Sequence, residues 1–452
     1  MTVDAYTFPL HSQSTFFCGD STVSGQQWAQ GCLALAQKIN DHSERNWLLY
    51  QDDFYQYSQY FFALLLANKN IILAQSEQCE RYKQAAKLAD ISVGKINTYA
   101  EQLIPHFSPN KRDYQDSKTL KLTSDPLTIN ANTCITMFTS GSTGEAKAIT
   151  KYWYQLANEI NTLQKLFPYS PSYIVSTVTH KHIYGLLFKL IWPVFTNRKI
   201  ICETVEYPEQ VEHYCQKFND IVLISSPSYL ARTSREFSVQ AINSINKIFC
   251  SGGALSANVA NDFMTLYQQA ITEIYGSTET GGIAWRHQTT NAQWQLFPEH
   301  QATLAQDNTL LLKSNLLPKG DVFKTDDRVE LNGRFFTLLG RTDRIIKLYE
   351  KRLSLDEMEV ELTRLLTIKA CHCFILDTPN SKAALVAVVE LEKQCELPTG
   401  TKQKKYLVNE CKQALLSVFE PSLLPRKWRF VQQLPFNSQG KLVKTALVNL
   451  FI

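Results

Sequence analysis

The chain has 452 residues, of which 44% are hydrophobic and 11% are aromatic. This length exceeds what one ordinary hydrophobic core accommodates, so two or more domains are expected. The 46 Lys and Arg residues nearly balance the 42 Asp and Glu residues, and the resulting net charge of +4 does not favour a nucleic-acid partner.

The eleven cysteines include no CxxC pair. Reduced thiols of a cytoplasmic protein fit this chain better than a disulfide framework does. The stretch CHC at 371–373 could suggest a metal site, but adjacent strand residues point to opposite faces, so a buried strand is the preferred interpretation. We expect no secretory signal and no membrane span, because the apolar runs are too short.

Residues 45–260 alternate short apolar runs with helical patterns. Helices are predicted over 54–68 and 256–269. Strands are predicted at 46–50, 70–74, 172–179, 220–227 and 245–253, the last running into a glycine turn. Apolar strands that alternate with helices indicate a mostly parallel sheet covered on both faces. Ligands of such folds bind at loops beyond the carboxyl ends of the strands.

The pattern changes after about residue 340. Short strands are predicted at 371–377, 384–392 and 427–436, with an amphipathic helix over 403–419. About 110 residues with their own strands and helix make a credible small domain. We therefore place a large domain at 1–341 and a small domain at 342–452.

The stretch FTSGSTGEAKAITK, residues 138–151, crowds glycines and hydroxyl residues ahead of Lys147. Taken alone, it is explained equally well as a flexible connector. Its alternative is an oxyanion-binding loop built from backbone amides, hydroxyls and one cation. The G-x-x-x-x-G-K-[ST] phosphate loop does not fit, because Ala146 and Ala148 flank the lysine.

Three further segments carry matching chemistry. EIYGSTETGG (273–282) supplies a hydroxyl for a phosphate oxygen and a carboxylate for the magnesium that accompanies ATP. The segment 323–353 supplies carboxylates that can accept hydrogen bonds from a ribose diol. LPFNSQGKLVK (434–444) supplies a lysine after a glycine turn.

In this order, the four segments resemble the motif series of adenylate-forming enzymes, which include acyl- and aryl-CoA synthetases, nonribosomal peptide adenylation domains and beetle luciferases. The resemblance covers residues 138–444. It implies an α/β fold with a large N-terminal multi-layer domain and a small mobile α+β C-terminal domain. It also implies that a carboxylate attacks the α-phosphate of ATP, and that a thiol then displaces AMP from the acyl-adenylate.

The resemblance further implies individual roles. Lys441 would bridge the attacking carboxylate and the α-phosphate, although a solvated surface lysine is the simpler interpretation of any one lysine. Thr278 would contact the α-phosphate and Glu279 would hold Mg²⁺. The remaining nucleotide-binding residues would be Thr139, Ser140, Gly141, Ser142, Thr143, Gly144, Lys147, Gly252, Gly253, Ala254, Tyr275, Gly276, Ser277, Asp327, Arg341 and Arg352. Asp343 would be the hinge of the small domain.

The chain also departs from the family pattern. A proline and a glycine usually flank the lysine that Ala146 and Ala148 flank here. Asp326 could replace Asp327 as the ribose ligand. Glu350 stands where a glycine normally lets a pantetheine arm pass, so the thiol step is the one most affected.

The acid is expected to have an uncharged tail, either aromatic or fatty. His182 matches a histidine at the floor of the acyl pocket in acyl- and aryl-activating relatives, with His180 as the alternative and a core histidine as the simpler interpretation. Amino-acid-activating relatives tend to carry an acidic residue in this region, and none occurs between 172 and 195. Tyr184, Phe188 and Trp192 recur at helical spacing and either line the pocket or pack in the core.

The acceptor thiol belongs to CoA or to the phosphopantetheine arm of an acyl carrier protein. The lysine-rich run at 401–405 permits an acidic carrier protein, although such a run is usually a solvated face. Two alternatives remain for the function. One is amino-acid adenylation for a carrier protein, and the other is a nucleotide-binding homologue without turnover.

Overall fold

The computed structural model describes residues 6–10, 14–19, 21–74, 79–95, 104–109, 126–140, 146–168, 172–348, 351–378, 381–416, 418–437 and 442–452. The chain divides into two compact units. The first contains residues 1–301 and 313–323, and the second contains residues 302–312 and 324–452. The predicted division into domains at 1–341 and 342–452 stays a prediction.

The first unit contains a large sheet in the order β15-β14-β13-β12-β11-β9-β10-β1-β2. The neighbouring strands from β13 to β1 are parallel, and β2, β14 and β15 are antiparallel to their neighbours. The strands are β1 (Thr15–Cys18), β2 (Ser21–Ser24), β9 (Tyr173–Ser176), β10 (Lys199–Thr204), β11 (Ile221–Ser225), β12 (Ile245–Cys250), β13 (Ile271–Ser277), β14 (Gly281–His287) and β15 (Asn291–Leu296).

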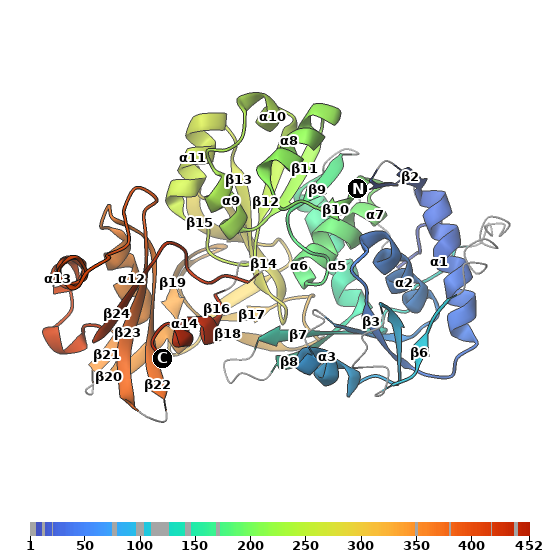
Figure 1. The fold of residues 1–452 in the computed structure, drawn as a ribbon. Helices are drawn as coiled ribbons and strands as arrows, with labels where there is room; N and C mark the ends of the chain where they lie inside the picture. The colour runs from blue at the N-terminus through green and yellow to red at the C-terminus, as the bar shows by residue number, and fades with distance from the viewer. Residues whose placement is uncertain are drawn as a thin grey trace. The chain divides into compact units, whose positions relative to one another are not determined.

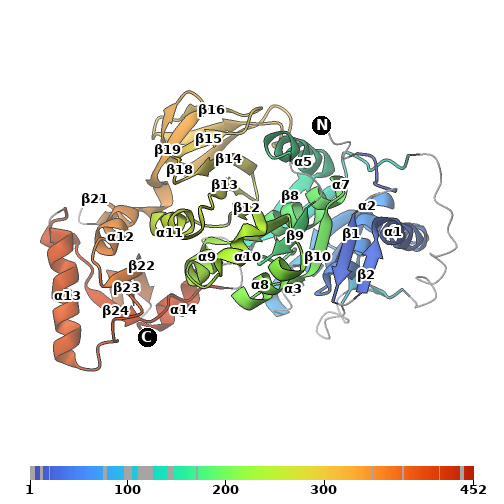
Figure 2. The same ribbon diagram turned by 90° about the horizontal axis from the view of Figure 1, so that it is seen from above.

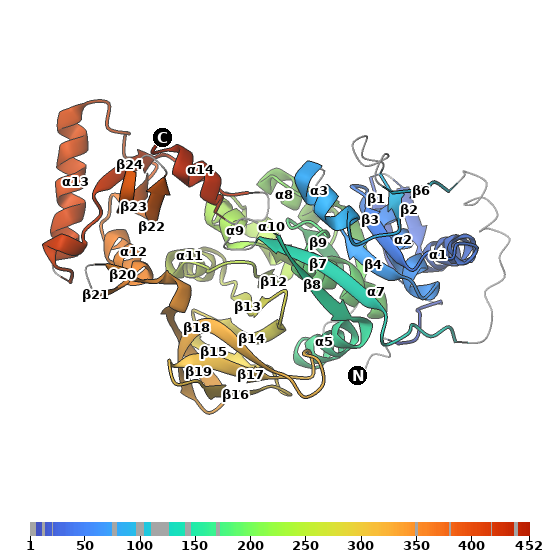
Figure 3. The ribbon, with the colours of Figure 1, turned by 90° about the horizontal axis from the view of Figure 1, so that it is seen from below.

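A second sheet in the same unit has the order β6-β5-β3-β4-β7-β8. Its first five strands are parallel, and β7 and β8 form an antiparallel hairpin (Figure 3). The strands are β3 (Asn46–Tyr50), β4 (Asn70–Leu73), β5 (Ile91–Gly94), β6 (His106–Phe107), β7 (Cys134–Ser140) and β8 (Ala146–Tyr152).

Helices cover both faces of the large sheet, so successive residues of its strands are buried in two different cores. Ile221 and Leu223 of β11 pack with α8–α11, which Figure 1 shows beside β11–β13, whereas Val222 and Ile224 pack with α1, α2 and α5. Figure 2 shows α1 and α2 beside β1 and β2. The helices are α1 (Gly25–Asn40), α2 (Phe54–Leu66), α5 (Trp153–Leu166), α8 (Pro208–Lys217), α9 (Pro227–Thr233), α10 (Val239–Asn243) and α11 (Ala257–Tyr267).

The smaller sheet closes the same central core from its other side. Trp47 and Leu49 of β3 join the core of α1 and α2, while Leu48 and Tyr50 pack against Tyr82 of α3 (Cys79–Ala86). The short helix α6 (Ile183–Gly185), the π-helical segment η2 (Leu186–Ile191) and α7 (Trp192–Phe195) complete this layer. The first unit is therefore a five-layer αβαβα stack, which confirms the predicted large multi-layer α/β fold.

The second unit contains antiparallel strand pairs and a three-stranded sheet packed with helices. The strands are β16 (Gln301–Leu304), β17 (Thr309–Lys313), β18 (Val322–Asn332), β19 (Phe335–Arg341), β20 (Ile345–Leu348), β21 (Lys351–Ser354), β22 (Ile368–Thr378), β23 (Ser381–Leu391) and β24 (Lys427–Val431). The helical segments are η3 (Thr342–Arg344), α12 (Leu355–Thr363), α13 (Thr401–Leu416), η4 (Pro421–Leu423) and α14 (Lys444–Asn449). Buried residues of α12 and α13 share one core with β22–β24, and α14 packs into another.

Most predicted elements are confirmed, with shifted ends. The strand expected over 172–179 ends at Ser176, because the Ser176 hydroxyl bonds the backbone N–H and carbonyl of Val178 and turns the chain. The strand expected over 427–436 ends at Val431. The stretch at 371–373 lies in β22, as expected, with Cys371 and Cys373 in one core. Within the described ranges, no helix is both long and apolar enough to span a membrane.

Candidate functional site

Four parallel strands of the large sheet end at the same edge, and each is followed by hydroxyl or glycine residues. The hydroxyls of Thr177 after β9 and Ser225 at the end of β11 lie 3.0 Å apart. After β12, the Ser251 hydroxyl donates to the carbonyl of Ile274 in β13 at 2.8 Å. This edge is where parallel α/β sheets bind ligands, and the predicted residues at 251–254 and 275–279 lie along it.

The turn between β13 and β14 presents Thr278 and Glu279. The strands pair Ser277 with Gly281, and the turn is closed by bonds between Ser277 and Thr280. The Ser277 N–H donates to the Thr280 hydroxyl at 3.1 Å, and the Thr280 N–H donates to the Ser277 hydroxyl at 3.2 Å. Because Ser277 and buried Thr280 bond each other, the side chains left for a ligand are those of Thr278 and Glu279.

The Glu279 carboxylate fits a divalent cation. It is half-buried, and among the residues that the structure describes it has no hydrogen-bond or ion-pair partner. Carboxylate oxygens are the ligands that Mg²⁺ takes together with substrate phosphates. Thr278, the neighbouring residue, can supply a hydroxyl to the same phosphate.

Glycines in this turn are required by close approach of neighbouring atoms. A Cβ at Gly276 would lie 2.2 Å from the carbonyl oxygen of Gly281, and a Cβ at Gly282 would lie 2.6 Å from the Phe297 ring. Gly281 has φ +70°, and its Cβ would lie 2.6 Å from a Glu159 carboxylate oxygen. Gly281 and Gly282 are therefore needed for close packing, a role that was not predicted from the sequence.

Beneath the turn lies a buried polar cluster that the sequence analysis missed. Lys151, at the end of β8, donates its ammonium to the carbonyls of Glu279 and Leu316, the latter at 3.1 Å. Gln155 donates to the same Leu316 carbonyl at 2.7 Å, and Glu159 accepts the Gly282 N–H at 2.8 Å. The three side chains are 2–4% exposed.

Burial shifts both charges of this cluster towards their neutral forms. It lowers the pKa of the Lys151 ammonium to about 8, against the opposing field of Glu159, and it raises the pKa of the Glu159 carboxyl. The available sequence signal was Gln155 and Glu159, two polar residues spaced by four in the helix α5 that follows Lys151.

The predicted phosphate loop lies between β7 and β8. These strands pair Thr139 with Lys147, and the Lys147 side chain is exposed. The predicted ligands at 141–144 lie outside the described residues, as does the side chain of Ser140. The described strands β7 and β8 form an antiparallel pair on either side of the glycine-rich segment in the sequence.

The other predicted nucleotide contacts in the first unit line the same sheet edge. Gly252 has φ +93° and no neighbour within 4 Å of an added Cβ, so the backbone here is open. The nearest neighbour of a Cβ at Gly253 is Pro227, at 3.7 Å. Ala254 is exposed, and the partly exposed Tyr275 ring lies 5.4 Å from the Trp294 ring.

The two histidines of the acyl-pocket prediction have different surroundings. His180 is 3% exposed, lies 4.3 Å from the Tyr57 ring and contacts the Gln51 carbonyl at 3.2 Å. Burial lowers its pKa to about 3. These contacts make His180 a core residue. His182 is partly exposed and begins α6, where its carbonyl accepts the Leu186 N–H at 2.7 Å.

The aromatic stripe after His182 packs in the core. Phe188 and Trp192 are 2% and 0% exposed, and the Phe188 ring lies 4.8 Å from the Tyr184 ring and 5.4 Å from the Trp192 ring. Core packing therefore accounts for Phe188 and Trp192.

In the second unit, Asp327 and Arg341 face each other across β18 and β19. Arg341 lies 3.6 Å from Asp327 and 3.3 Å from Asp326, measured between nitrogen and carboxylate oxygen. The Asp327 side chain is 18% exposed and that of Asp326 is 65% exposed. Asp327 is thus the better sheltered of the two carboxylates beside Arg341, and the ribose role of the pair stays a prediction.

The remaining predicted residues of this unit are only partly described. Asp343 lies in the η3 turn, between Arg341, whose N–H donates to Asp356, and Arg344, whose guanidinium also bonds Asp356. Arg352 lies in β21, and its side chain is outside the described residues. Lys441 lies outside them altogether, as does Glu350.

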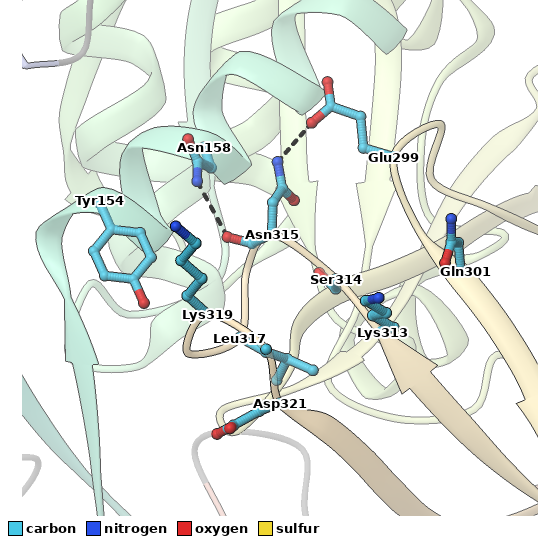
Figure 4. A pocket seen from close by; sticks show the side chains of 11 residues that line it. Tyr154, Asn158, Glu299, Gln301, Lys313, Ser314, Asn315, Leu317, Lys319 and Asp321 are labelled. Atoms are coloured by element: carbon cyan, nitrogen blue, oxygen red, sulfur yellow. Dashed lines mark hydrogen bonds between the residues drawn. The ribbon is translucent and has the colours of Figure 1, made fainter.

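A separate pocket of about 400 Å³ opens on the first unit (Figure 4). In it Asn158 donates to the carbonyl of Asn315 at 3.1 Å, and the Asn315 amide donates to Glu299. Its lining consists of Tyr154, Asn158, Glu299, Gln301, Lys313, Ser314, Asn315, Leu317, Lys319, Gly320 and Asp321. None of these is a predicted site residue.

Solved structures share this fold over almost the whole chain. The ATP-bound MatB of Rhodopseudomonas palustris has a TM-score of 0.80 at 14% identity and covers 98% of this chain and 96% of its own. The O-succinylbenzoate coenzyme A synthetase of Bacillus subtilis, in complex with AMP, has a TM-score of 0.77 at 14% identity and covers 97% and 96%. The chain thus has the same fold as these two proteins.

Sequence relatives lead to the same family. The model of the AMP-binding enzyme family matches residues 55–309, more than half of the chain. The D-alanine–D-alanyl carrier protein ligase of Staphylococcus aureus is 22% identical over 72% of this chain and 73% of its own length. Tyrocidine synthase 3 of Brevibacillus parabrevis is 22% identical over 69% of this chain, which spans only 5% of that protein. The chain belongs to the AMP-binding enzyme family, and the resemblance inferred from its motifs is confirmed.

Proposed function

We propose that the chain activates a carboxylic acid with ATP and transfers the acyl group to a phosphopantetheine thiol. In the first step, a carboxylate oxygen bonds the α-phosphorus and pyrophosphate leaves. In the second, the thiol sulfur bonds the acyl carbon of the acyl-adenylate, its proton is lost, and AMP leaves. The observation that carries the proposal is the Thr278–Glu279 turn, fixed at the carboxyl edge of the sheet in a chain of this family.

The proposed roles follow the charge that the reaction moves. Thr278 would contact the α-phosphate, and Glu279 would hold the Mg²⁺ that offsets phosphate charge. The 139–144 loop and Lys147 would bind the phosphates that depart. Lys441 would place a positive charge between the attacking carboxylate and the α-phosphate, where negative charge gathers in the transition state.

The nucleoside would be held by several weaker contacts. Residues 252–254 and Tyr275–Ser277 would flank the adenine, and the Asp327–Arg341 pair would bind the ribose hydroxyls. Arg352 would reach a phosphate in one of two orientations of the small domain, with Asp343 as the hinge. Hinges concentrate dihedral changes in a few residues.

An aromatic or fatty acid is the proposed substrate class. The support is the absence of Asp and Glu between residues 172 and 195, together with a partly exposed His182 followed by buried aromatic side chains. The competing class is an amino acid, which the name of the D-alanine–D-alanyl carrier protein ligase favours. Its ammonium would require a carboxylate partner in the pocket.

The acceptor is CoA or an acyl carrier protein. Both present the same phosphopantetheine thiol, and names among similar proteins include a carrier protein ligase and a coenzyme A synthetase. A carrier protein differs by offering an acidic surface, for which the lysines at 401–405 would provide a partner. Mass spectrometry of CoA and of a phosphopantetheinylated carrier protein, each incubated with enzyme, ATP and acid, distinguishes the two.

Replacing Lys441 tests the catalytic role directly. Lys441→Ala should abolish acid-dependent exchange of pyrophosphate into ATP while ATP binding, measured by calorimetry, survives, because this lysine acts mainly in the transition state. Lys444→Ala is the matched control, since it removes a lysine three residues away that has no proposed role. Unchanged exchange in Lys441→Ala would contradict the proposal and favour a nucleotide-binding protein without turnover.

A further inference from the structure

We propose that Lys151 and Glu159 are positioning residues that hold the Thr278–Glu279 turn against the strand carrying Lys147. The consequence for nucleotide binding rests on the proposed function, whereas the holding of the turn does not. Neither residue belongs to the catalytic set above. Both lie in the first unit, and both form hydrogen bonds with backbone groups of the turn.

Lys151 connects the strand that carries Lys147 to the Thr278–Glu279 turn. It lies in β8 four residues after Lys147, so the two side chains point to the same face about 13 Å apart along the strand. Its ammonium bonds the carbonyl of Glu279, which is 128 residues away in the sequence. Strand β8, which also carries Lys147, is thereby bonded to the residue proposed to hold the metal.

Glu159 grips the other arm of the same turn. Its carboxylate accepts the Gly282 N–H at 2.8 Å, and a Cβ at Gly281 would lie 2.6 Å from it. Lys151 and Glu159 also attract each other electrostatically, since each opposes the effect of burial on the other. The turn is therefore held three residues apart, at the Glu279 carbonyl and the Gly282 amide, by side chains of opposite charge.

Two buried charged side chains are a costly way to hold a turn in place. Isolated buried charges are strongly unfavourable, and apolar substitutes for a buried ion pair are often neutral or stabilising. We explain the presence of these two charged residues by their effect on the position of the turn, since they hold its backbone in one place. The Glu279 side chain branches from the same residue as the peptide carbonyl that Lys151 holds, so fixing that carbonyl fixes the backbone position from which the carboxylate extends.

The first test is hydrogen exchange of the turn amides in the unliganded protein. Lys151→Met, which keeps an unbranched apolar chain but removes the ammonium, should speed exchange of the Ser277–Gly282 amides by about tenfold. Lys189→Met is the matched control. Lys189 is also fully buried and bonds the carbonyls of Cys202 and Glu203, but these lie on β10. Its replacement should affect residues 199–205 and leave the turn unchanged.

The second test is the metal dependence of ATP binding, measured by calorimetry with Mg²⁺ and with a chelator. In Lys151→Met, the factor by which Mg²⁺ increases the affinity for ATP should fall about tenfold, and the affinity for ATP without metal should not change. In Lys189→Met, neither quantity should change. A general loss of stability would affect both variants alike. If Lys151→Met does not fold, Lys151→Gln, which retains an amide donor, should show the same changes at smaller size.

The outcomes separate this inference from the proposed function. Unchanged exchange at Ser277–Gly282 in the Lys151 variant, or an equal increase in the Lys189 variant, would overturn the positioning role whether or not ATP binds. Failure of the unmodified protein to bind ATP would instead refute the proposed function, and the exchange experiment would still decide the positioning role.

Discussion

Replacing Gly281 by alanine should destabilise the first unit in two ways, by backbone strain and by a steric clash of the added methyl group. Gly281 has φ +70°, a left-handed conformation that costs an L-residue about 1–2 kcal/mol. A methyl group there would also lie 2.6 Å from a Glu159 carboxylate oxygen and 3.2 Å from the Leu316 side chain. Overpacking of this kind typically costs a further 1–3 kcal/mol, approximately.

Gly19→Ala is the control, because it introduces the same backbone strain without a steric clash. Gly19 lies in the same unit with φ +62°, and no atom lies within 4 Å of an added Cβ. The free energy of unfolding should therefore fall by about 1–2 kcal/mol in Gly19→Ala, and by roughly 1–3 kcal/mol more than that in Gly281→Ala.

Urea unfolding followed by tryptophan fluorescence measures both values. Equal destabilisation of the two variants would mean that Glu159 and Leu316 move aside at no cost, and the reasoning about a rigid cluster beneath the turn would be refuted. Gly281→Ala should also weaken Mg²⁺-dependent ATP binding, because the displaced Glu159 can no longer hold the Gly282 amide in place.

Three other predictions concern different parts of the chain. Burial lowers the pKa of Lys189 to about 7, whereas an unfolded lysine titrates near pH 10.4, so between these values the unfolded chain binds more protons and stability rises with pH. Urea unfolding between pH 7 and 10 should show that Lys189→Met reduces this slope by up to about 1.4 kcal/mol per pH unit, and an identical slope would contradict the shift. Glu279→Gln should raise the Mg²⁺ concentration needed for pyrophosphate exchange about tenfold with little change in melting temperature, since the carboxylate makes no hydrogen bond or ion pair with the described residues. A melting temperature that falls with no change in Mg²⁺ dependence would argue for a structural role. Asp343→Pro should impair one half-reaction more than the other by restricting rotation of the small domain, and equal loss of adenylation and thiol transfer would count against the hinge.

The layered fold and the edge that carries the site could be predicted from the sequence because they depend on local patterns. The apolar runs at 46–50 and 221–225 are buried on both faces, and uninterrupted apolar runs of this kind indicate covered parallel strands. The Thr278–Glu279 turn was likewise predictable, because strand, glycine and hydroxyl residues follow one another within ten positions.

The cluster beneath the turn could not be predicted in the same way. Its bonds join residues 123 and 128 positions apart, and nothing local distinguishes Lys151 from a solvated lysine. The choice between His180 and His182 also depended on burial, since both follow the same strand. The structure makes His180 a core residue, and the pocket role of His182 stays a prediction.

Carboxylate-dependent exchange of labelled pyrophosphate into ATP is the most direct test of the central claim. The account predicts exchange with aromatic or fatty acids and little with amino acids, and it predicts that exchange requires Mg²⁺ and Lys441. Exchange confined to amino acids would reassign the substrate class while keeping adenylate formation. No exchange with any acid in the panel, in a protein that binds ATP, would contradict the claim that the chain forms acyl-adenylates.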